Sequence, residues 1–121
     1  MTTMRAVAVV AAVAAAVGAS AQAAPRTART TALLKTVNVT ATEFKFALSS
    51  KSAGRGIVIF KVKNAGKIAH DFQINGRRTP LISPGKSNTL RVTFLKKGAY
   101  PYTCTVPGHA AAGMRGVFTI T

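Results

Sequence analysis

Residues 98–121 read GAYPYTCTVPGHAAAGMRGVFTIT and contain two stretches in which large apolar side chains alternate with smaller or polar ones. Tyr100, Tyr102 and Cys104 occupy alternate positions in the first stretch, and Phe118 and Ile120 do so in the second. A period of two is typical of a β-strand with one buried face. The segment therefore predicts two short strands joined by a loop rich in Pro, Gly and Ala.

The same alternation recurs upstream, and it is punctuated by turn residues. Turns are predicted at 54–56, 64–66, 75–76, 83–85 and 97–98, where Gly, Asn, Pro or Lys-Gly pairs interrupt the pattern. The alternating apolar groups between them are Val37/Val39, Phe44/Phe46/Leu48, Val58/Phe60/Val62, His70/Phe72/Ile74 and Leu90/Val92/Phe94. With no helical period after the N-terminal region, we expect an all-β sandwich or barrel of about seven or eight strands.

The N-terminal region has the composition of an export signal. A short basic start (1–5) precedes an apolar run of Ala and Val (6–17), and Ala21-Gln22-Ala23 matches a signal-peptidase site. The run is shorter than the roughly 20 residues that cross a bilayer as a helix. We therefore predict a secretory signal peptide at 1–23, a flexible basic leader at 24–34 and one domain at 35–121, exported to a periplasm or to the outside of the cell or its surface.

The chain is strongly basic. Its 121 residues include 17 Lys and Arg but only two acidic residues, Glu43 and Asp71. Loss of Arg5 with the signal leaves sixteen basic and two acidic residues, a net charge of +14. Such a charge attracts acidic proteins, anionic membranes or cell-wall polymers, and export makes nucleic acid the least suitable partner. A solvated basic surface that keeps a monomer soluble is the alternative.

One cysteine, two histidines and one methionine form a set of possible metal ligands. Four residues separate Cys104 from His109, four more separate His109 from Met114, and His70 lies on an earlier strand. Each has an ordinary structural explanation alone: a buried cysteine, a core methionine or a hydrogen-bonded histidine. Together, two imidazoles, a thiolate and an axial thioether are the ligands of a type 1 copper ion. Two His and one Cys could also bind zinc, but the methionine favours copper.

The loop CTVPGHAAAGM, preceded by Gly98–Tyr102, resembles the ligand loop of the cupredoxins, and its spacing is most similar to that of rusticyanin. Asn64-Ala65-Gly66 followed by His70 resembles the family's strand with the first histidine. The resemblance implies a Greek-key β-sandwich or barrel with one copper ion. It also implies that His70, Cys104 and His109 are equatorial ligands and that Met114 is axial.

The function implied by the resemblance is one-electron transfer to a redox partner protein, which the basic charge predicts to be acidic. No histidine remains for the additional copper ions of oxidases or nitrite reductases, so we do not expect an enzyme. The same ligands would also serve an extracytoplasmic protein that captures or delivers copper. A basic surface-binding β-domain with an incidental metal is a third reading.

Two features near the site each allow two interpretations. Family members often have Asn after the first histidine, whereas this chain has Asp71. A carboxylate facing copper would favour the oxidised ion, but strand parity predicts an outward side chain that pairs with a nearby Lys. The alanines at 110–112 would form either a small apolar docking patch, if His109 lies near the surface, or simply a tight loop.

Overall fold

A computed structural model describes residues 34–121, which form one β-domain. The predicted signal peptide and residues 24–33 of the predicted leader lie outside this range. The strands are β1 (Leu34–Thr42), β2 (Lys45–Leu48), β3 (Ser52–Ala53), β4 (Gly56–Asn64), β5 (Gln73–Ile74), β6 (Arg77–Arg78), β7 (Ser87–Phe94), β8 (Gly98–Thr103) and β9 (Arg115–Ile120), with one helix, α2 (His109–Ala112).

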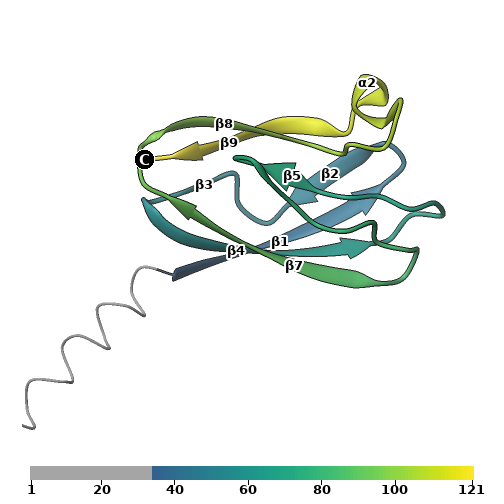
Figure 1. The fold of residues 1–121 in the computed structure, drawn as a ribbon, viewed down its shortest axis with the longest axis horizontal. Helices are drawn as coiled ribbons and strands as arrows, with labels where there is room; N and C mark the ends of the chain where they lie inside the picture. Colours follow the sequence, from purple (N-terminus) through teal and green to yellow (C-terminus); the bar gives the residue numbers. More distant parts are fainter. Residues whose placement is uncertain (1–33) are drawn as a thin grey trace, which may run out of the picture. The chain divides into compact units, whose positions relative to one another are not determined.

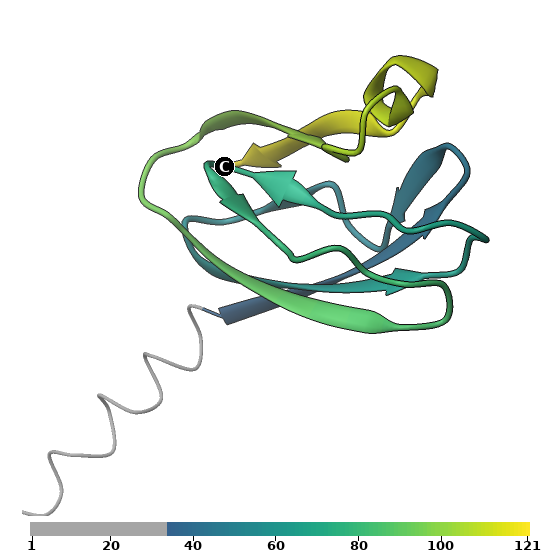
Figure 2. The ribbon, with the colours of Figure 1, turned by 45° about the vertical axis from the view of Figure 1, so that its right-hand side comes forward.

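The strands form two sheets, stacked as the layers of a sandwich (Figures 1 and 2). One sheet has the order β2-β1-β4-β7 and the other has the order β3-β9-β8-β5-β6. The chain passes repeatedly from one sheet to the other, so β1 pairs in parallel with β4 and β3 pairs in parallel with β9. Connections of this kind are characteristic of Greek-key sandwiches, and the predicted all-β class is confirmed.

The alternating residues of the sequence fill the space between the sheets. Phe60 on β4 packs against Phe72, Phe94 and Phe118, with ring centroids 5.2, 6.4 and 5.3 Å away respectively. All four rings are buried. Because β4 alternates strictly, Lys61 and Lys63 point to solvent while Val58, Phe60 and Val62 face the core. Aromatic packing between the sheets therefore supports the loops at one end of the sandwich.

The structure differs from the sequence prediction in three local features. Within residues 34–121 there are nine strands rather than seven or eight, because β3, β5 and β6 are pairings of only two residues. The predicted strand through His70 and Ile74 is regular only at Gln73–Ile74, and His70 makes an isolated bridge with Ile82. The loop after Cys104 contains the single helical turn α2, which the alternation of the sequence does not predict.

The Asn75-Gly76 turn is confirmed. Both residues have positive φ angles, 51° and 75°, in the two-residue loop between β5 and β6. This conformation matches the twist of a tight hairpin and favours Asn and Gly.

Within the described range no helix is long and apolar enough to cross a bilayer.

Candidate metal centre

His70 is positioned by a loop that a buried asparagine organises. The Asn64 side chain, at the end of β4, donates from Nδ2 to the carbonyl oxygens of Ile68 and Ile82, at 2.8 and 2.7 Å. Its Oδ1 accepts the backbone N–H of Gly66 at 2.8 Å. His70 then exchanges backbone hydrogen bonds with Ile82 at 3.2 and 2.7 Å. These bonds fix the backbone on both sides of His70, so its imidazole has a defined position at the end of the sandwich.

The segment from Cys104 to Met114 is a closed loop between β8 and β9. The N–H of Cys104 donates to the carbonyl of Met114 at 3.1 Å, and the N–H of Met114 donates to that of His109 at 3.0 Å. Gly108, just before α2, has a φ angle of 85°, which an L-residue rarely adopts. After the Pro-Gly turn, residues 109–112 fold back as one helical turn. This turn places Nδ1 of His109 at 3.6 Å from Sγ of Cys104.

The donor atoms of three predicted ligands converge. Nδ1 of His70 lies 3.2 Å from Nδ1 of His109, and that atom lies 3.6 Å from Sγ of Cys104. The three ligand atoms all lie within 4.8 Å of one another, and the three residues are buried. Two imidazole nitrogens and one sulfur that face one another match the equatorial donor set of type 1 copper. The residues present thus fit a single copper ion.

Met114 lies beside Cys104 in the core. It is fully buried and packs with Cys104 and Ala41, while Phe46 and Val106 close the small cluster. A thioether is a weak ligand that suits copper in this environment. The structure therefore places Met114 next to Cys104, and its role as axial ligand remains a prediction.

Burial affects the chemistry of the thiol. Desolvation raises the pKa of Cys104, and the backbone N–H groups of Asp71 and Val106 partly counteract this rise. The thiolate is the form that binds a metal. Copper binding must therefore displace a proton from Cys104, and the two N–H groups are placed to stabilise the negative sulfur that results.

The structure overturns the prediction that Asp71 is a surface acid paired with lysine. Asp71 is only 4 % exposed, and its Oδ1 accepts the backbone N–H of Thr105 at 2.6 Å. Its Oδ2 accepts a hydrogen bond from the Thr105 hydroxyl. Strand parity fails here because residues 70–72 are not a regular strand and the cysteine loop covers the other side. Asp71 thus anchors the residue that follows Cys104. It occupies the position after the first histidine, where many family members have Asn.

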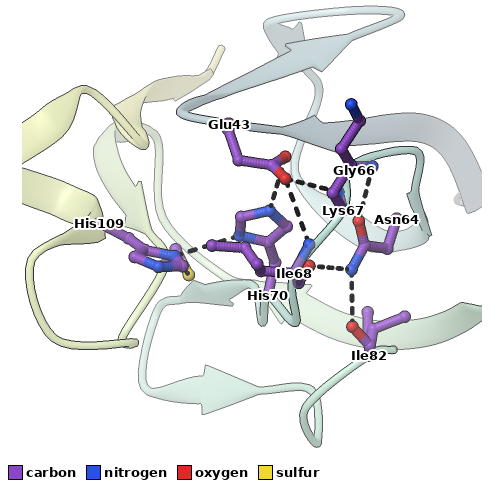
Figure 3. A network of polar contacts seen from close by, with 9 residues as sticks. Glu43, Asn64, Gly66, Lys67, Ile68, His70, Ile82 and His109 are labelled. Atoms are coloured by element: carbon purple, nitrogen blue, oxygen red, sulfur yellow. Dashed lines mark hydrogen bonds and ion pairs between the residues drawn. The ribbon is translucent and has the colours of Figure 1, made fainter. Parts of the chain in front are cut away.

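Sequence reasoning missed the turn between β1 and β2, which contacts both histidines. Oε2 of Glu43 lies 3.3 Å from Nε2 of His70 (Figure 3). The ring of Phe44 packs edge-on against that of His109, with the ring centroids 5.0 Å apart. The Lys67 N–H, together with His70, lowers the pKa of Glu43. The scarcity of acids was an available signal: both acidic residues of this basic chain contact the site or its loop.

The comparisons with known proteins identify the family. Residues 30–121 match the model of the copper binding proteins of the plastocyanin/azurin family. The chain belongs to this family. It is a cupredoxin, and its cofactor is a single type 1 copper. The predicted likeness to rusticyanin in ligand spacing is not tested by these comparisons and stays a prediction.

Known relatives resemble this cupredoxin in part of their length. It is 40 % identical over 43 residues to Auracyanin-B of Chloroflexus aurantiacus and 45 % identical over 40 residues to the copper-resistant cuproprotein CopI of Pseudomonas aeruginosa. These matches cover 36 % and 33 % of this chain but only 18 % and 22 % of the relatives. The fold matches reduced auracyanin of Roseiflexus castenholzii with a TM-score of 0.66 at 21 % identity, over 72 % of this chain and 97 % of that one.

Proposed function

We propose that this cupredoxin is an exported one-electron carrier in which His70, Cys104 and His109 are equatorial copper ligands and Met114 is the axial ligand. The observation that carries the proposal is the convergence of two Nδ1 atoms and one sulfur, with a buried thioether packed in the same cluster as the cysteine. Copper held by these four side chains would supply one-electron chemistry. The hydrogen-bonded loops hold the donors in place, which limits rearrangement on electron transfer.

The side of the site at His109 suits electron entry. His109 is 8 % exposed whereas His70 is completely buried. Ala111 and Ala112, which lie in α2 after His109, are exposed, and so is Phe44 beside the His109 ring. A partner could approach this apolar surface closely without removing charged groups from water. This arrangement supports the docking-patch reading of the alanines.

Exposed basic residues lie close in sequence to the residues of this surface and of the site. Lys45 follows Phe44, Lys67 precedes the loop that holds His70, and Arg115 follows Met114, and all three are exposed. The two acidic side chains are engaged with His70 and Thr105 rather than with these cations. We therefore expect an acidic redox partner, whose association should weaken as ionic strength rises.

The proposal includes no catalytic centre. The chain contains two histidines, and both belong to the copper site, so no imidazole is left for a second copper ion. Export is supported by the signal-like sequence at 1–23. N-terminal sequencing of the protein secreted by a bacterial host tests it, because cleavage after Ala23 would leave Ala24 as the first residue.

The visible absorption spectrum of the copper-loaded, oxidised protein tests the site. An intense thiolate-to-copper band is expected in the wild type, and Cys104→Ser should abolish it. Thr103→Ser, a matched change at the neighbouring half-buried position, should leave the band in place. A colourless wild-type protein that does not take up copper would refute the proposal.

A role in copper capture or delivery is the second candidate, favoured by the local similarity to CopI. The two roles differ in what leaves the protein. Rapid electron self-exchange with copper retained would support the carrier. Fast transfer of copper to a chelating acceptor, with slow self-exchange, would support delivery.

A further inference from the structure

Glu43 is held against the buried histidine by several independent contacts. Its Oε1 accepts the backbone N–H groups of Lys67 and Ile68, at 2.5 and 3.2 Å, and its Oε2 faces Nε2 of His70. Figure 3 shows the carboxylate bridging the loop at 66–68 and the His70 ring, while His109 lies on another side of that ring. The carboxylate therefore has a fixed orientation toward His70.

Gly66 makes this close approach possible. A Cβ atom at position 66 would lie 1.9 Å from Oε2 of Glu43, which is far inside any contact distance. The glycine, which Asn64 also fixes through its backbone N–H, thus leaves a space that the carboxylate fills. The space, the hydrogen bonds and the placement of the turn together point to a specific role for Glu43.

The contact decides which nitrogen of His70 is free to bind a metal. Nδ1 faces His109 and the cysteine, whereas Nε2 faces the carboxylate. An ionised carboxylate can only accept hydrogen bonds, so the His70 proton is placed on Nε2 and Nδ1 keeps its lone pair. Carboxylates in this position orient metal-binding histidines and make them more basic.

The charge of Glu43 is directed at the same group. In the described part of the chain, His70 is the one side-chain partner found for this carboxylate, and no Lys or Arg side-chain nitrogen lies within salt-bridge distance of it. Its negative charge is therefore balanced mainly by backbone N–H groups and by the histidine. A negative charge at this place stabilises the more positive oxidised ion more than the reduced ion.

We propose that Glu43 is a positioning residue that holds His70 in its metal-binding tautomer and favours oxidised over reduced copper through its charge. The inference rests on the proposed function, because it assumes that His70 binds copper through Nδ1. It adds a tuning group that lies 27 positions before the histidine and outside the ligand loop.

The test compares Glu43→Gln, which keeps the shape and an acceptor oxygen but removes the charge, with Glu43→Ala, which removes both. Thr93→Lys is the control, because it makes the same +1 change of charge at an exposed position near the other end of the sheet. Copper(II) and copper(I) affinities and the reduction potential are measured on the full copper-loaded proteins. Nitrogen-15 NMR of the metal-free proteins reports the His70 tautomer.

We expect Glu43→Gln to weaken copper(II) binding about tenfold relative to copper(I) binding. A tenfold change in this ratio corresponds to a rise in potential of about 59 mV for one electron. Glu43→Ala should in addition mix the two His70 tautomers in the metal-free protein, and Thr93→Lys should change neither property.

An unchanged potential in Glu43→Gln, in a wild-type protein that binds copper normally, would overturn the role of the charge. A wild-type His70 protonated on Nδ1 in the metal-free protein would overturn the role in positioning. Failure of the wild type to bind copper would instead refute the proposed function, and the NMR result would still decide the tautomer.

Discussion

Replacement of Asp71 by alanine should detach the loop that carries Cys104. The Asp71 carboxylate is buried and accepts two hydrogen bonds from Thr105, one from the backbone and one from the hydroxyl. A hydrogen bond to a charged group contributes about 1.5–3 kcal/mol, and a buried N–H left without a partner adds to the loss. We therefore expect Asp71→Ala to lower the free energy of unfolding by about 3–5 kcal/mol.

Asp71→Asn separates the hydrogen bonds from the charge. The amide oxygen can still accept the Thr105 N–H, and the amide nitrogen can donate to the hydroxyl, so the geometry is retained with weaker, neutral bonds. The expected loss is less than about 2 kcal/mol. Relief from burying an ionised group offsets part of that loss.

Urea and thermal unfolding of the metal-free protein measure these effects without the contribution of copper. For a domain of this size, 1 kcal/mol corresponds to about 4–8 °C in Tm, so Asp71→Ala should melt at least about 12 °C lower than the wild type. Asn38→Ala, a truncation at an exposed position of β1, is the control and should change stability by less than about 0.5 kcal/mol. If Asp71→Ala costs no more than this control, the carboxylate does not anchor the loop and our reasoning is wrong.

Three further predictions concern the two histidine-bearing loops. Gly66→Ala should displace the Glu43 carboxylate, since the new Cβ would lie 1.9 Å from Oε2, and should reproduce the copper affinities of Glu43→Ala, as measured by competition with a chelator. Hydrogen bonding lowers the pKa of Glu43, so its contribution to stability is present above the pKa of about 4.5 in the unfolded chain and is lost as pH falls through the lower pKa of the folded protein. On acid titration, Glu43→Gln should therefore lose less folding stability than the wild type. Because burial raises the pKa of Cys104, copper uptake near neutral pH releases the thiol proton, and the apparent affinity should rise at least about tenfold per pH unit between pH 6 and 8; a pH-independent affinity would contradict this.

Much of the fold could be predicted because alternation of apolar and polar residues shows which face of a strand is buried, even before the neighbouring strands are known. Val58, Phe60 and Val62 are buried as the alternation of β4 predicts. The turn at Asn75-Gly76 also follows from local chemistry, since both residues tolerate positive φ angles. The order of the strands does not follow, because parallel pairs such as β1 with β4 depend on contacts between distant segments.

The candidate site, like the fold, has features that the sequence predicts and features that only the tertiary structure shows. The sequence by itself determined the donor types, since one cysteine, two histidines and a methionine at these spacings carry their chemistry wherever the backbone places them. Only the tertiary structure decided what surrounds the donors. Glu43 meets His70 across 27 positions and Asp71 meets Thr105 across 34, and neither contact has a period or a local motif. Such contacts depend on how irregular loops from different strands meet at one end of the sandwich, and a side chain in a loop has no strand parity to indicate where it points.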